Sequence, residues 1–183
     1  MTHFHRFITQ FIERLGLITG YLGLILVVNT ALVVALRYAF NWAPIALQET
    51  MTYLHASLFM LGAAYTLKHD GHVRVDVFYQ HYTEKKKALI NLLGTLFLLF
   101  PTCIFILFIC YPYVESSWNM NERSIEGNGL PWLYLLKGLL LLQPILLMLQ
   151  GVAEIIKHIF VLQGRSLSEL DLDDGPNLDG GHL

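Results

Sequence analysis

Three charged side chains stand inside or at the end of long apolar stretches: Arg37, Glu49 and Lys137. An ionisable group at membrane depth costs at least a few kcal/mol and persists only with a partner or a purpose. The helical rise puts Glu49 about 6 Å and Lys137 about 10 Å inward from the same end of their stretches, where Arg37 closes another. We expect an interhelical ion-pair cluster that fixes the helices, with a substrate site as the alternative.

Two further polar side chains, His55 and Gln143, fall near the middle of two apolar stretches. A hydrogen bond between their helices is the simpler interpretation. The alternative is a haem held between two axial histidines, as in small membrane subunits of respiratory enzymes. Of the other histidines, His72 and His81 lie in a loop and His158 lies at a boundary. A second haem ligand at the depth of His55 is therefore missing.

Other chemical motifs are absent from the sequence. It has no Gly-rich phosphate loop, no His and carboxylate cluster with metal-ligand spacing, and no nucleophile and base pair. Cys103 and Cys110 share one helix face, where ordinary packing suits them better than a disulfide or a metal. The 12 basic and 14 acidic residues form no basic patch of the kind that binds nucleic acid. We expect a protein that is not an enzyme and holds no cofactor or metal.

The elements that must position these residues are four apolar stretches, at about 15–36, 45–67, 88–111 and 130–156. A helix rises about 1.5 Å per residue and the hydrocarbon core of a bilayer is about 30 Å thick, so each stretch is long enough to cross it. The composition, 55% hydrophobic and 14% charged, agrees. We predict an all-α integral membrane protein with four transmembrane helices in one domain over 1–162, a kink at Pro101, and an acidic, disordered tail over 163–183.

The positive charges predict the orientation of these helices. Most of the 12 Lys and Arg residues fall in the N-terminal segment, in the loop between the second and third stretches, and after the fourth stretch. Because short cytoplasmic loops carry the excess of Lys and Arg, we expect both termini in the cytoplasm. The first stretch is too long for a signal-peptide core and lacks a cleavage site after it, so we interpret it as a retained signal anchor.

Two loops are candidates for contacts with other proteins. The loop predicted on the outer side carries Glu115, Trp118, Glu122, Arg123 and Glu126. The inner loop contains His72, Arg74 and Asp76 alternating with valines; it either caps the second helix and pairs Arg74 with Asp76, or docks another subunit.

Small residues mark two surfaces on which helices can approach closely. Gly16 and Gly20 form a GxxxG pattern on the first stretch, and Gly62 and Ala63 lie near the inner end of the second. Such surfaces suit close helix packing, either inside the bundle or with a partner.

The segment 46–79 is the most specific part of the sequence. Together with the preceding Arg37 and Tyr38, it resembles the DctQ-type small permease subunit of tripartite ATP-independent periplasmic (TRAP) transporters. The matching positions are an Arg-Tyr ending the first span, a Glu opening the second, a Gly-Ala pair, and a His-x-Arg-x-Asp motif; here they are Arg37, Tyr38, Glu49, Gly62, Ala63, His72, Arg74 and Asp76. The resemblance continues through Trp118 and Glu126 to Glu154.

The resemblance implies a non-catalytic subunit of a three-part importer in the bacterial inner membrane. In that family a large permease subunit carries the substrate and sodium sites and moves as an elevator, and a periplasmic binding protein delivers the substrate, commonly an organic acid. The small subunit would brace the large one and help dock the binding protein. Two rival functions are a haem- or quinone-anchoring subunit of an oxidoreductase and a self-contained small oligomeric transporter.

Overall fold

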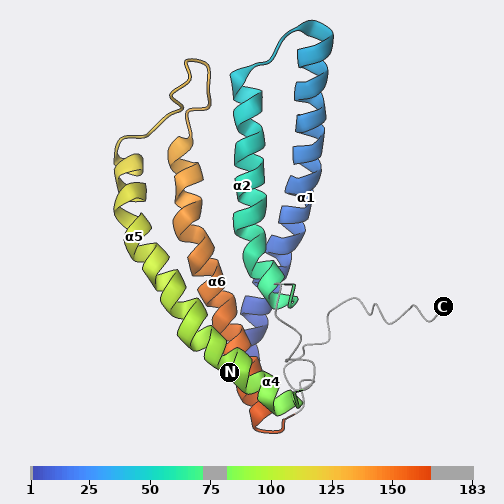
Figure 1. The fold of residues 1–183 in the computed structure, drawn as a ribbon, viewed down its shortest axis with the longest axis vertical. Helices are drawn as coiled ribbons and strands as arrows, with labels where there is room; N and C mark the ends of the chain where they lie inside the picture. Colours follow the sequence, from blue (N-terminus) through green and yellow to red (C-terminus); the bar gives the residue numbers. More distant parts are fainter. Residues whose placement is uncertain (1, 72–81, 166–183) are drawn as a thin grey trace, which may run out of the picture.

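The computed structural model describes residues 2–71 and 82–165, and every regular element within them is helical. The elements are α1 (Thr2–Phe40), α2 (Ile45–Lys68), α4 (Glu84–Gly94), the π-helical segment η1 (Thr95–Leu99), α5 (Phe100–Asn119) and α6 (Leu133–Leu162). Figure 1 shows α1, α2, α5 and α6 as long helices that run from the top of the view toward the bottom. The inner-loop residues His72, Arg74 and Asp76 and most of the predicted tail lie outside the described residues.

Helix α1 is much longer than the sequence predicts. It begins at Thr2 rather than near residue 15, and ends at Phe40. The added turns carry Ile8 and Ile12, four residues apart on one face, and both side chains are fully buried. The N-terminal segment is therefore a packed part of the bundle and not only a charged flank of the first apolar stretch.

The connection between α1 and α2 is short and stiff. Asn41 adopts a left-handed backbone with φ of 49°, which ends α1, and Pro44 directly precedes α2. Gln48 donates a side-chain hydrogen bond back to the Ala43 carbonyl at 3.1 Å. A link of so few residues forces α1 and α2 to run antiparallel, side by side (Figure 1).

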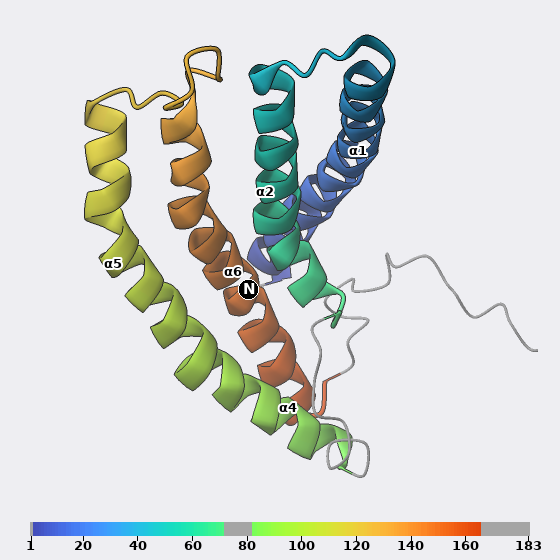
Figure 2. The ribbon, with the colours of Figure 1, turned by 45° about the horizontal axis from the view of Figure 1, so that its top comes forward.

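The third predicted stretch forms one continuous path through α4, η1 and α5. The disturbance expected at Pro101 takes the form of the π-helical segment η1 immediately before it, where the Phe100 amide donates to the Thr95 carbonyl. Proline has no amide hydrogen and its ring crowds the preceding turn, so a locally widened helix accommodates it. The path bends as it passes from α4 into α5 (Figure 2).

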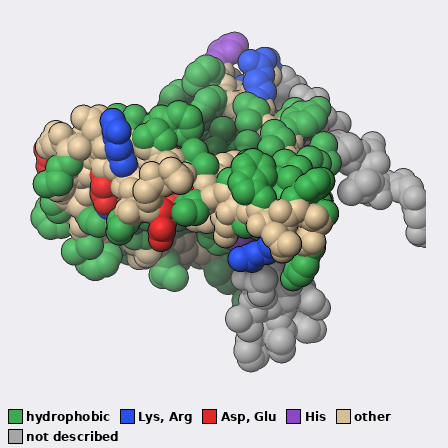
Figure 3. Space-filling view, turned by 90° about the horizontal axis from the view of Figure 1, so that it is seen from above, with side chains coloured by type: hydrophobic (Ala, Val, Ile, Leu, Met, Phe, Trp, Pro, Cys, Tyr) green, Lys and Arg blue, Asp and Glu red, His purple; other side chains and the backbone are tan. Residues whose placement is uncertain are grey.

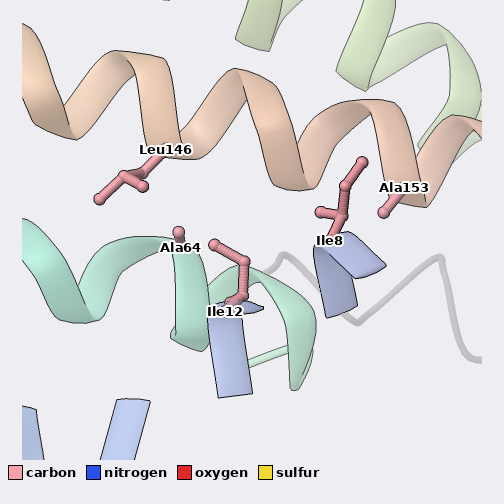
Figure 4. Close-up of a cluster of buried hydrophobic side chains, with 5 residues drawn as sticks. All are labelled: Ile8, Ile12, Ala64, Leu146 and Ala153. Carbon is pink, nitrogen blue, oxygen red and sulfur yellow. The ribbon is translucent and has the colours of Figure 1, made fainter. Parts of the chain in front are cut away.

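Helix α6 is the centre of the bundle, since it packs against α1, α2, α4 and α5. The main core lies where α1 begins and where α2 and α6 end, which we call the closed end. Figure 4 shows the side chains that meet there, which are Ile8, Ile12, Ala64, Leu146 and Ala153. At the opposite end, the open end, the α1–α2 connection and the loop 120–132 stand apart, and α2 and α6 diverge (Figures 1 and 2).

Large apolar side chains cover the outer surface of the bundle. Phe108 on α5 is 80% exposed, and apolar side chains are exposed along α1 and α6 as well. Seen from the open end, hydrophobic side chains cover much of the surface, and the acidic side chains lie over the α5–α6 side (Figure 3). A water-soluble protein would bury such side chains, whereas a bilayer solvates them.

Within residues 2–71 and 82–165, three helical segments are long and apolar enough to cross a membrane: His3–Phe40, Glu84–Asn119 and Leu133–Leu162. They support an all-α membrane protein. Helix α2 has 24 residues but is not among them, because Gln48, Glu49 and His55 lower its hydropathy. Three of the four predicted spans thus meet the criteria of length and composition.

Candidate functional site

Glu49, in the first turns of α2, holds the loop 120–132. Its carboxylate accepts a hydrogen bond from the Ser124 hydroxyl and another from the Leu130 backbone amide at 2.5 Å. Gly129 fits beside these groups only because it has no side chain; an added Cβ would collide with Ser124 and would stand 2.7 Å from the Glu49 Oε1 atom. The carboxylate therefore ties the α5–α6 connection to the start of α2.

Lys137, in the second turn of α6, fixes the same loop from the other side. Its ammonium donates to the Glu122 carboxylate at 2.5 Å and lies 4.1 Å from the centre of the Tyr113 ring. Lys137 also holds the pKa of the Glu122 carboxyl below its ordinary value, mainly through this hydrogen bond. The ion pair joins the end of α5 to the start of α6.

The predicted three-charge cluster therefore takes a different form. Within the described residues, Lys137 pairs with Glu122 rather than with Glu49, and Glu49 bonds to the loop. Arg37 is exposed at the end of α1 and forms no ion pair with Glu49 there. The physical reason is that the loop 120–132 folds back over the open end and brings Glu49 and Lys137 nearer partners.

The predicted hydrogen bond between His55 and Gln143 is not formed. His55 is exposed on α2, and neither side chain forms a hydrogen bond within residues 2–71 and 82–165. Gln143 instead lines a cavity of about 570 Å³ between α1, α2 and α6. In the same described ranges, no group of three or more metal-ligating side chains comes together.

The residues of the predicted docking loop divide into two kinds. Trp118 packs edge-on against Tyr134, with the ring centroids 5.2 Å apart, and Glu122 is held by Lys137. The side chains that face outward are Glu115, Arg123, Glu126 and the apolar Ile125, which is 98% exposed. The first kind shapes the loop, and the second is available to another protein.

The small residues serve two purposes. Gly16 lies against the Tyr65 ring so closely that an added Cβ would collide with it, and a Cβ at Gly23 would stand 3.0 Å from Leu58. These two glycines let α1 and α2 approach each other. Gly20 and Gly62 have no atom within 4 Å of the position a Cβ would take. Internal packing therefore explains Gly16 and Gly23 but not Gly20 or Gly62.

Sequence reasoning missed the polar residues of the closed end. Glu13 pairs with Lys68 and lies 3.1 Å from the His69 ring nitrogen, which locks the start of α1 to the end of α2. On α6, Gln150 donates to Glu154 at 3.1 Å, and both side chains are buried. Extending the first helix back to its N-terminal residues would have placed Glu13 beside Lys68, since the two helices are antiparallel.

Comparisons with known proteins identify the family. The family model described as "Tripartite ATP-independent periplasmic transporters, DctQ component" matches residues 26–160. The match runs from the middle of α1 to near the end of α6 and covers most of the chain. No curated protein and no solved structure matches the chain in the corresponding searches. The chain belongs to the DctQ family of TRAP transporter components, the small membrane subunits of these transporters.

Proposed function

We propose that this protein is the non-catalytic small subunit of an ion-gradient-driven importer in a bacterial inner membrane, bracing a large permease subunit that carries the solute. The observation that carries this proposal is the family match over residues 26–160. In this assignment the substrate, an organic acid or a similar solute, and the coupling ion, sodium, are bound by the large subunit.

The cavity between α1, α2 and α6 supports a bracing role over a transporting one. Its lining contains no Lys, Arg or His, and the polar groups in it are mainly hydroxyls and the Gln143 amide. An organic anion inside a membrane protein needs a positive charge or several hydrogen-bond donors. A brace needs only a rigid body with an apolar outer surface, against which a moving transport domain can slide.

We propose four membrane spans in a single domain over 1–162, with α2 as the second span and both termini in the cytoplasm. Helix α2 is 24 residues long and lies between two of the apolar helices, α1 and α6. A span shielded by neighbours tolerates polar side chains better than one that faces lipid. A fluorescent protein that folds only in the cytoplasm, fused after Leu183, should fluoresce; a dark, exported fusion would overturn the orientation.

The loop 120–132 is our candidate for a contact with the periplasmic binding protein. Glu49 and Glu122 fix its shape, and Glu115, Arg123, Ile125 and Glu126 face outward. An exposed apolar tip among charges of both signs suits a transient interface. Neutralising Glu115, Arg123 and Glu126 together should weaken docking of the binding protein; unchanged docking would remove this part of the proposal.

Purification of the tagged chain from native membranes in a mild detergent tests the main proposal. We expect a larger polytopic permease to co-purify in stoichiometric amount, identified by mass spectrometry. Recovery with a flavin or iron–sulfur subunit, or with absorbance in the Soret region, would favour the oxidoreductase-anchoring alternative. Recovery of the chain alone, with solute flux after reconstitution, would favour a self-contained transporter.

A further inference from the structure

A groove runs along α2 between α1 and α6. At the closed end α1 and α6 touch, with Ile8 beside Ala153 (Figure 4). Beyond that contact the two helices diverge on either side of α2 (Figure 1). The resulting cavity of about 570 Å³ has Phe59 and Gly62 of α2, Gly20 of α1 and Gln143 of α6 in its lining.

The groove has open space where its glycines lie. Neither Gly20 nor Gly62 has a neighbouring atom within 4 Å of the position a Cβ would occupy, although both residues line the cavity. Nothing within the described bundle therefore uses the room that these glycines leave. Glycine costs helix stability relative to alanine, so a close approach by another body would account for both positions.

Gln143 in the groove lining and His55 on the same face of α2 as Phe59 form no hydrogen bond within the described residues. His55 lies about 15 Å along α2 from its start at the open end, and Gln143 lies about 15 Å along α6 from its own start there. The two therefore share a level near mid-membrane. His55 and Phe59 are exposed on the α2 face that continues to Gly62. At that depth no bulk water is present to satisfy an imidazole or an amide.

We propose that this groove receives one transmembrane helix of the large permease subunit, packed against Gly20 and Gly62 and carrying a hydrogen-bonding side chain level with His55 and Gln143. A lipid chain fits the apolar lining but carries no hydrogen-bonding group at mid-depth, whereas a protein helix supplies both shape and polarity. This inference rests on the proposed function and names the surface through which the brace acts.

Filling the groove is the first test. In the tagged full chain purified from native membranes, Gly62→Leu should lower the amount of co-purified large subunit by about tenfold, as expected when a packed interface is overfilled. Gly94→Leu is the matched control, because Gly94 also has open space around its Cβ position but lines a different cavity, next to α4 and α5. Gly94→Leu should leave the amount of co-purified large subunit unchanged. Equal recovery with both variants would overturn the proposal.

Replacing His55 is a second test, because it removes a polar group without filling the groove. His55→Leu should lower recovery of the large subunit by about threefold, the typical weight of one hydrogen bond between membrane helices. Unchanged recovery with this variant would contradict the assigned role of His55. Chain yield in the membrane serves as the folding control for both substitutions.

A photoreactive amino acid at Phe59 identifies the occupant directly. Phe59 is 64% exposed and lines the cavity, so we expect a crosslink to the large subunit. The same probe at Phe108 on α5, 80% exposed and outside the cavity, should not give that product. Crosslinks from Phe59 only to lipid or to a second copy of the chain would overturn the inference. If the unmodified chain recovers no permease at all, the proposed function itself fails.

Discussion

The two ends of the bundle are held together by different forces. At the closed end, α1, α2 and α6 bury apolar side chains against one another, and Glu13 pairs with Lys68 across the outside of that core. At the open end, α2 and α6 diverge, and the loop 120–132 bridges them through the Glu49 and Lys137 contacts. The buried residues of α6 all lie between Pro144 and Phe160, and most of them are in its half toward the closed end.

This difference separates the part of the chain that packs against itself from the part where we propose that a partner binds. Direct packing between helices makes the closed end rigid without help. Next to that core, in the middle of the bundle, a groove lies between α1, α2 and α6, and at the open end the fixed loop exposes Arg123, Ile125 and Glu126. A subunit that braces another protein needs both properties: a rigid base and an incomplete surface.

Removing core volume at the closed end should have the largest effect. Ile12→Ala deletes most of a fully buried side chain, and we expect it to lower the unfolding free energy by about 2 to 4 kcal/mol. Ile18→Ala, on the same helix but 54% exposed, is the matched control and should cost far less. Unfolding of the purified chain by added sodium dodecyl sulfate measures both; equal losses would contradict the assignment of the core.

Releasing the loop should have a smaller and local effect. Glu49→Gln weakens the acceptor that holds Ser124 and Leu130, at a cost of about 1 to 3 kcal/mol. Amide hydrogen exchange over 120–132 should accelerate, while exchange over α1 near Ile12 stays unchanged. Glu115→Gln, at an exposed position, is the control. Faster exchange at both ends would show that the two ends are coupled and not stabilised independently.

The Glu122–Lys137 pair should respond to pH. Because Lys137 lowers the pKa of folded Glu122, the pair stabilises the loop above the ordinary glutamate pKa of about 4.3 and loses that contribution as the pH falls through the lowered value. Carbon-13 NMR of labelled glutamate should show the low pKa, and Lys137→Met should raise it. An ordinary pKa for Glu122 in the intact chain would contradict this ion pair.

Removing Arg37 should have the smallest effect on the fold. Its side chain is exposed and forms no hydrogen bond or ion pair within the described residues, so Arg37→Gln should change the unfolding free energy by less than about 0.5 kcal/mol. Exchanging the charges of Glu49 and Lys137 is the complementary test. The double variant should not recover the unfolding free energy that the single variants lose. Recovery would support the direct ion pair between these two residues that the sequence predicts.

The sequence was sufficient for the helical class and for most helix positions, because apolar runs of membrane length leave few other structures. It misplaced the start of α1, since the buried pattern of Ile8 and Ile12 is interrupted by polar and charged neighbours. The partners of Glu49 and Lys137 were not predictable, because they come from the loop 120–132. Because a loop has no repeating hydrophobic pattern, its sequence does not indicate which helices it will contact.

The central claim is that the chain acts as one subunit of a larger permease complex. Native mass spectrometry of the complex purified in mild detergent tests it most directly. We predict one copy of this 20.9 kDa chain bound to one copy of a larger polytopic permease. A species containing only copies of this chain, or this chain with an oxidoreductase subunit, would contradict the claim.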